Sequence, residues 1–236
     1  MFNIKIADIV IGVENKYEYI REMCRDYITE EKAEFCVSAT DEEIMSEDAG
    51  EEQGLPPFYL ETLAIYRKIA DKMPEYNGFL MHGVLMSAEE CGILLTAESG
   101  TGKSTHAALW MRLLGDVCEI INGDKPLIRI IDGVTYAYGT PWCGKEGIHK
   151  NKRVVLTDIC FLERGKENSV CDVDKREIMQ NLLPSIHIPQ NDGVLAVLDA
   201  IDAMARLVNF RRIQCNMDIS AAETAYNEIM KGKKTK

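Results

Sequence analysis

The sequence lacks a stretch of apolar residues long enough to cross a membrane. A spanning helix needs roughly 18 or more apolar residues in a row, and no window of the 236 residues approaches that length. The N-terminal segment MFNIKIADIVIGVENK carries an acidic residue within its apolar stretch and has no small-residue cleavage site, so it does not resemble an export signal. We therefore expect a cytoplasmic protein with no membrane partner.

Basic residues are few relative to acidic ones: 27 lysines and arginines stand against 38 aspartates and glutamates, for a formal net charge of −11. This balance opposes binding to nucleic acid. The eight cysteines include no Cys-x-x-Cys pair, which argues against a zinc site or a disulfide framework and favours reduced thiols. Internal repeats and heptads are absent too, so neither a solenoid nor a coiled coil is predicted.

The sequence does contain a series of short apolar strands and amphipathic helices, which predicts an α/β fold. We expect a small N-terminal α+β subdomain at residues 1–55, a main domain at 56–232 and a basic tail at 233–236. In the subdomain we predict a strand at 3–13, a helix at 15–28, a strand at 34–39 and a solvated acidic loop over the run at 40–57.

The main domain is predicted to alternate strands and helices around one core. Two short apolar runs form an antiparallel pair before residue 98, and Asp132-Gly133 between alternating runs indicates a hairpin. The predicted helices lie at 58–73, up to Leu114, at 174–183, at 192–208 and from Ile219, and the predicted strands at 78–87, 91–97, 117–122, 126–139 (the hairpin), 153–164 and 209–215.

The segment AESGTGKSTHAALW, residues 97–110, joins a predicted strand to a predicted helix. Glycines, a lysine followed by a hydroxyl residue and the positive end of a helix are what a phosphate-binding loop (P-loop) needs, although Ala97 stands where such loops usually begin with glycine. We expect Lys103 to reach the β- and γ-phosphates of ATP and Ser104 to bind Mg²⁺. The expected nucleotide-binding residues are Ser99, Gly100, Thr101, Gly102, Lys103, Ser104 and Thr105.

Two further residues are candidates for chemistry at this loop. Asp124 follows the strand at 117–122, at the sheet edge where such folds bind ligands, and it either serves the reaction or only forms a turn in NGDKP. His82 lies in the strand before the loop and faces either the core or the site. We predict Lys103, Asp124 and His82 as catalytic residues, and Ser104 and Asp124 as metal ligands.

A third group of residues is predicted to contact the substrate. The loop YGTPWCGKEG, residues 138–147, is rich in residues that set backbone shape, which suggests a substrate-facing wall containing Trp142, Gly144 and Lys145. Arg212, on a late strand, could reach an anionic group. The alternatives are that Trp142 caps the core and that Arg212 is an ordinary surface charge.

In this order, the segments MHGVLMS, ILLTAESGTGKSTHAALW, INGDKPLIR, GTPWCGKEG and ICFLER resemble the HPr kinase/phosphorylase-related P-loop proteins, whose core is shared with phosphoenolpyruvate carboxykinases. The resemblance implies a P-loop mixed β-sheet core of that type, in which Lys103 and Ser104 match the phosphate-loop pair and His82 the histidine before it. The family typically has two adjacent aspartates where this chain has Gly123-Asp124, so only Asp124 carries over. A glycine-rich signature of the HPr enzymes is also missing, which disfavours HPr as the substrate.

The loop and the resemblance together predict an ATP- and Mg²⁺-dependent kinase that phosphorylates a serine-type hydroxyl of a small molecule, peptide or protein. Two other functions stay open. One is a nucleotide-binding or sensing protein in which Gly123 records the loss of a catalytic carboxylate, and the other is an ATPase without an acceptor. A homo-oligomer is compatible with the sequence, which does not decide the oligomeric state.

Overall fold

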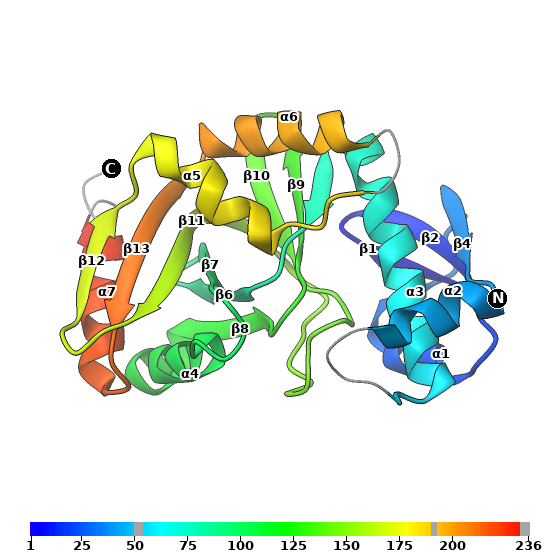
Figure 1. Cartoon of the computed structure of the whole chain (residues 1–236), viewed down its shortest axis with the longest axis horizontal. Helices are drawn as coiled ribbons and strands as arrows, with labels where there is room; N and C mark the ends of the chain where they lie inside the picture. The colour runs from blue at the N-terminus through cyan, green and yellow to red at the C-terminus, as the bar shows by residue number, and fades with distance from the viewer. Residues whose placement is uncertain (50–53, 190–192, 232–236) are drawn as a thin grey trace.

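The computed structural model describes residues 1–49, 54–189 and 193–231, and these residues form a mixed α/β protein with two sheets. Figure 1 shows the N-terminal sheet at one end of the molecule and the larger sheet with its helices filling the rest. The basic tail predicted at 233–236 lies outside the described residues.

The N-terminal sheet has the strand order β3-β1-β2-β4. Its first two strands form a hairpin, because Ala7 and Asp8 adopt left-handed conformations (φ 51° and 57°) that reverse the chain. The single strand predicted at 3–13 is therefore wrong, and the helix predicted at 15–28 is much shorter than expected. The elements are β1 (Phe2–Ile6), β2 (Ile9–Glu14), α1 (Tyr19–Met23), a 3-10 turn η1 (Arg25–Tyr27), β3 (Ile28–Thr29) and β4 (Phe35–Ser38).

The acidic run after β4 begins with a helix, α2 (Asp41–Ser46), where a solvated loop was predicted. Thr40 and Glu43 form a capping box: the Glu43 backbone N–H donates to the Thr40 hydroxyl (3.2 Å), and the Thr40 N–H donates to the Glu43 carboxylate (2.8 Å). This reciprocal pair stabilises the first turn despite the run of like charges. Residues 50–53 of the predicted loop lie outside the described residues.

The larger sheet follows the order β5-β9-β10-β11-β7-β6-β8, with β13 paired to β11 and β12. Its central strand, β11, joins two parts: its first residues run antiparallel to β10, and its later residues run parallel to β7 and β13. The predicted hairpin at Asp132-Gly133 and the antiparallel β6–β7 pair are confirmed. The strands are β5 (Gly78–Leu80), β6 (Val84–Ala88), β7 (Cys91–Thr96), β8 (Cys118–Asn122), β9 (Leu127–Ile131), β10 (Val134–Tyr138), β11 (Arg153–Arg164), β12 (Ser169–Asp172) and β13 (Asn209–Cys215).

Helices form two separate apolar clusters with the larger sheet. Trp110 and Ala225 belong to a cluster that unites two helices with β6 and β7, and Ile178 and Ile201 belong to one that unites two others with β11. Figure 1 shows α6 lying across the top of β9 and β10. The helices are α3 (Pro57–Lys72), α4 (Lys103–Leu114), α5 (Lys175–Leu182), α6 (Val194–Ala205) and α7 (Ile219–Lys231).

Helix α3 links the two sheets. Its buried residues Leu60 and Ile65 share one apolar cluster with β1 and β2 and with Leu127 and Tyr138 of the larger sheet. The carboxylate of Glu61, fully buried on the same helix, accepts backbone N–H bonds from Lys16 and from Tyr17 (3.1 Å). This contact fixes the segment that leads into α1. The boundary predicted at residue 55 stays a prediction, since the helix that follows it packs on both parts.

We predict that Glu61→Ala lowers the free energy of unfolding by about 2 kcal/mol, because two backbone N–H groups lose a charged acceptor. Chemical denaturation with urea measures this change. The control Glu30→Ala removes an exposed glutamate that follows β3 of the N-terminal sheet. It should change the free energy of unfolding by less than about 0.5 kcal/mol. Equal stabilities for the two variants would contradict the role given to Glu61.

Candidate functional site

The loop at residues 97–102 connects the end of β7 to the start of α4. Gly100 and Gly102 hold φ values of 76° and 119°, which only glycine adopts readily. Gly102 is the N-cap of α4, so no side chain caps this helix end, and its first turn contains no acidic residue. The uncapped N–H groups and the positive end of the helix dipole therefore favour an anion at this loop.

Lys103 is held at the start of α4 with its ammonium group folded back over the loop. Its Nζ donates to the backbone carbonyl of Ala97 (3.0 Å), and the side chain is buried. Burial lowers the pKa of Lys103, and the negative charge of Asp124 opposes this shift. Of the neighbouring predicted residues, Ser104 is half-buried and Thr105 is exposed.

Asp124 and His82 are hydrogen-bonded to each other beside this loop. Nε2 of His82 lies 3.0 Å from Oδ1 of Asp124. Burial favours the neutral carboxyl, but the hydrogen bond from His82 and the charges of Lys125 and Lys103 outweigh it and lower the pKa of Asp124. The carboxylate thus stays ionised near neutral pH. Asp124 thus lies in the NGDKP turn and also contacts His82; its part in a reaction stays a prediction.

The fully buried side chain of Asn122 fixes the turn that carries Asp124. Its Oδ1 accepts the backbone N–H groups of Asp124 (2.9 Å) and Lys125 (2.7 Å). Its Nδ2 donates to the carbonyls of Thr140 (2.9 Å) and Trp142 (3.3 Å). One amide therefore ties the carboxylate turn to the loop at 138–147. Sequence reasoning missed Asn122, although a polar residue that ends an apolar strand was a signal.

Gly123, which precedes Asp124, lies too close to another segment for a side chain. A Cβ atom at this position would stand 2.7 Å from the backbone carbonyl oxygen of Cys143. The Gly123 N–H also donates to the carbonyl of Ile148 (3.0 Å). Gly123 stands where the first of two adjacent aspartates was expected. The close approach of the loop at 138–147 leaves no room for a side chain at this position.

Two cavities meet at the His82–Asp124 pair. The first, of about 940 Å³, is lined by His82, the loop residues up to Thr101, the end of β11 and part of α5. The second, of about 310 Å³, is lined by Asp124, Lys125 and Trp142 together with residues of α1 and α3. His82 faces one cavity and Asp124 the other, so their hydrogen bond lies at the boundary between them.

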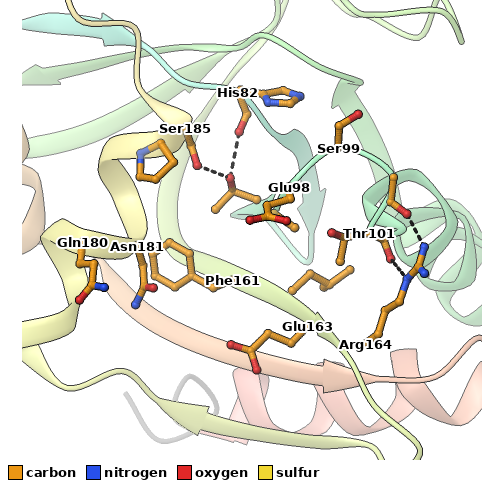
Figure 2. A pocket seen from close by; sticks show the side chains of 15 residues that line it. His82, Glu98, Ser99, Thr101, Phe161, Glu163, Arg164, Gln180, Asn181 and Ser185 are labelled. Carbon is orange, nitrogen blue, oxygen red and sulfur yellow. Dashed lines mark hydrogen bonds between the residues drawn. The ribbon is translucent and has the colours of Figure 1, made fainter.

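In Figure 2 the loop with Ser99 and Thr101 lies on one side of the first cavity, and Gln180 and Asn181 of α5 lie on the other. Nδ2 of Asn181 is buried and has no hydrogen-bond partner among the described residues. A buried donor without a partner carries an energetic cost.

Arg164, at the end of β11, supports the loop from the same cavity. Its guanidinium donates to the carbonyls of Gly100 (2.5 Å) and Thr101 (3.2 Å), which Figure 2 shows as dashed lines. Arg164 thus fixes the loop through two of its carbonyl oxygens, and the Thr101 N–H donates to the carbonyl of Glu98 (3.2 Å) within the loop. Arg164 was not among the predicted site residues, because nothing in the sequence shows that the end of β11 lies beside the loop.

The predicted substrate residues do not all meet. Trp142 is buried, stacks on Tyr66 with ring centroids 4.1 Å apart and donates from Nε1 to the carbonyl of Thr62 (2.8 Å), yet it also lines the second cavity with Gly144. Lys145 is exposed on the same loop and lines neither cavity. Arg212 lines neither cavity, and it pairs at 2.9 Å each with Glu163, which lines the first cavity, and with Glu177.

Within residues 1–49, 54–189 and 193–231, no three histidine, cysteine, aspartate or glutamate side chains gather as a metal site would require. Magnesium at substrate phosphates needs only one or two protein ligands, which Ser104 and Asp124 could supply.

Among the described residues, no helix combines the length and the apolar character needed to cross a bilayer.

Neither a protein-family model nor a curated protein matches the sequence. Among solved structures, the chain is similar to the Hpr(Ser) kinase/phosphatase from Coxiella burnetii, with 12% identity, a TM-score of 0.39 and coverage of 66% of this chain and 93% of that chain.

We predict that Gly123→Ala and Gly123→Asp both lower the free energy of unfolding by about 1–3 kcal/mol, since the clash with the Cys143 carbonyl arises at Cβ and is common to both side chains. Urea denaturation of the two variants and the wild type measures this. A Gly123→Ala variant as stable as the wild type would show that a second aspartate could be accommodated here.

Proposed function

We propose that this protein is an ATP-dependent kinase that transfers the γ-phosphoryl group to an alcohol. The observation that carries the proposal is the His82–Asp124 pair, which lies between a cavity lined by the loop at 97–102 and a second cavity. A phosphoryl transferase needs its donor and its acceptor on opposite sides of the reacting phosphorus. Two cavities that meet at an ionised carboxylate provide this arrangement.

The first cavity is assigned to the nucleotide. The uncapped N–H groups of α4 and the ammonium group of Lys103 supply positive charge where phosphates would bind. Nζ of Lys103 donates to a neutral carbonyl, that of Ala97, and a phosphate oxygen is a stronger acceptor. These groups would place the phosphates of ATP at the loop, beside a cavity whose lining includes Glu98 and Glu163 but not Lys103.

The second cavity is assigned to the alcohol. In the proposed step the alcohol oxygen forms a bond to the γ-phosphorus, and the bond from that phosphorus to the β–γ bridging oxygen breaks, with its electron pair leaving on ADP. The alcohol proton passes to the carboxylate of Asp124, which the His82 hydrogen bond holds in place. Lys103 stabilises negative charge on the phosphoryl oxygens.

Magnesium fits the same site as a cofactor. Ser104 and Asp124 would hold the ion together with the substrate phosphates, and it would neutralise phosphate charge when bound. A carboxylate that stays ionised near neutral pH, as Asp124 does, suits this role as well as that of proton acceptor.

The alternative, a nucleotide sensor with reduced catalysis, rested on Gly123 as a lost carboxylate. The close approach of the Cys143 carbonyl gives that glycine a packing reason, which removes the observation that favoured this alternative. An ATPase without an acceptor is disfavoured by the second cavity, because a water molecule needs no such space beside Asp124.

We predict that Lys103→Ala and Asp124→Asn each reduce phosphoryl transfer by about 100-fold or more, since each removes a group that acts at the reacting phosphate or hydroxyl. The assay follows label from γ-³²P-ATP into a panel of hydroxyl compounds and peptides.

The controls for this assay are Lys32→Ala and Asp132→Asn, both exposed and far along the chain from the loop at 97–102; both should keep wild-type activity. ATP binding without transfer to any acceptor would favour the sensor. Phosphate release that needs no acceptor and survives Asp124→Asn would favour a different hydrolytic site.

A further inference from the structure

The second cavity is lined on one side by residues of the N-terminal unit, by which we mean residues 1–49. Glu22 of α1 and Arg25 of the turn η1 line it opposite residues that belong to the larger sheet and its loops. Two hydrogen bonds hold this turn in place: the Tyr27 hydroxyl bonds Nδ1 of His149 (3.2 Å), and Nδ2 of Asn151 donates to the carbonyl of Asp26 (2.9 Å). Charged groups of the N-terminal unit are thus held at a cavity that contains Asp124.

The two carboxylate oxygens of Asp124 have different neighbours. Oδ1 is bound to His82, on the side of the nucleotide cavity. Oδ2 lies toward Gly144, where an added Cβ atom would stand 3.7 Å from it, and Gly144 lines the second cavity. Nζ of Lys125 lies 4.0 Å from the same oxygen, a separation that leaves room for a hydroxyl group in the second cavity to approach Oδ2.

The size of the second cavity, about 310 Å³, lies at the lower end of the range for small-molecule sites. Its lining combines one cation and one anion from the N-terminal unit, Arg25 and Glu22, with the carboxylate of Asp124 and the neighbouring ammonium group of Lys125, which is already paired with Asp124 (4.0 Å). The Arg25 side chain is 76% exposed, with the neighbouring Asp26 at 3.6 Å, so a ligand carboxylate can approach it. Glu22 offers an acceptor for an ammonium group.

We propose that this cavity binds a free hydroxy amino acid, with its hydroxyl at Asp124, its carboxylate at Arg25 and its ammonium group at Glu22. The proposal rests on the assignment of the first cavity to ATP, since the hydroxyl is the group that would receive the phosphoryl. A serine within a peptide chain lacks both charges and leaves Arg25 and Glu22 without ligand partners.

Four probes test the proposal in binding measurements that do not depend on catalysis. L-Serine carries both charges, D-glycerate lacks the ammonium group, ethanolamine lacks the carboxylate, and N-acetyl-L-serinamide lacks both and stands for a serine inside a peptide. Trp142 lies in the cavity wall, so its fluorescence follows each titration of the full chain. We expect L-serine to bind about fivefold or more tightly than each of the other three.

Substitutions then assign each preference to a side chain. Arg25→Ala should remove the preference for L-serine over ethanolamine, and Glu22→Gln should remove the preference for L-serine over D-glycerate. The matched controls Arg21→Ala and Glu18→Gln alter a pair on the same segment (3.6 Å apart) that does not line the cavity, and they should leave both preferences unchanged. Circular dichroism of each variant confirms that it is folded.

The proposal is overturned if N-acetyl-L-serinamide binds as tightly as L-serine, if L-serine does not bind, or if Arg25→Ala and Glu22→Gln leave the preferences intact. A transfer assay with γ-³²P-ATP distinguishes failure of this ligand proposal from failure of the proposed kinase activity. If L-serine binds with the expected preferences but no phosphoserine forms, the ligand class is supported and the kinase activity is rejected. Transfer to N-acetyl-L-serinamide but not to L-serine would sustain the kinase and reject the ligand class.

Discussion

The site depends on one buried amide. Asn122 accepts the N–H groups of the turn that carries Asp124 and donates to the loop that carries Trp142. Because the side chain is fully buried, loss of any of these bonds would leave a polar group unpaired inside the protein. The amide therefore holds the carboxylate turn and the loop at 138–147 in one geometry, and it keeps Asp124 in reach of His82.

The net charge of the chain does not by itself set the charge at the site. The net charge of −11 is spread over the chain, and charges on an exposed surface are screened beyond about 8 Å at physiological ionic strength. At the site itself, the uncapped end of α4, Lys103 and Lys125 bring positive charge near Asp124, while Glu98 and Glu163 line the first cavity and Glu22 lines the second. The local balance, rather than the net charge, sets which ligand the two cavities favour.

Much of the local structure could be predicted, and the meeting of distant residues could not. The Asp132-Gly133 hairpin and the helix after the loop at 97–102 follow from turn residues and helical periodicity. The β1–β2 hairpin was missed because Ala7 and Asp8 are not typical of such turns. The single strand predicted at 78–87 is wrong: His82 lies in the link between β5 and β6, so strand pleating does not decide where it faces. The places of Arg164 and Arg25 depend on strand order and tertiary packing, which no local pattern records.

The most direct measurement of the central claim is a crystal structure with Mg²⁺ and a non-hydrolysable ATP analogue. The account predicts that the γ-phosphate lies between Lys103 and His82, that Arg164 still holds the Gly100 and Thr101 carbonyls, and that Oδ2 of Asp124 remains open to an empty second cavity. A nucleotide bound in the second cavity, or a γ-phosphate remote from the His82–Asp124 pair, would contradict it.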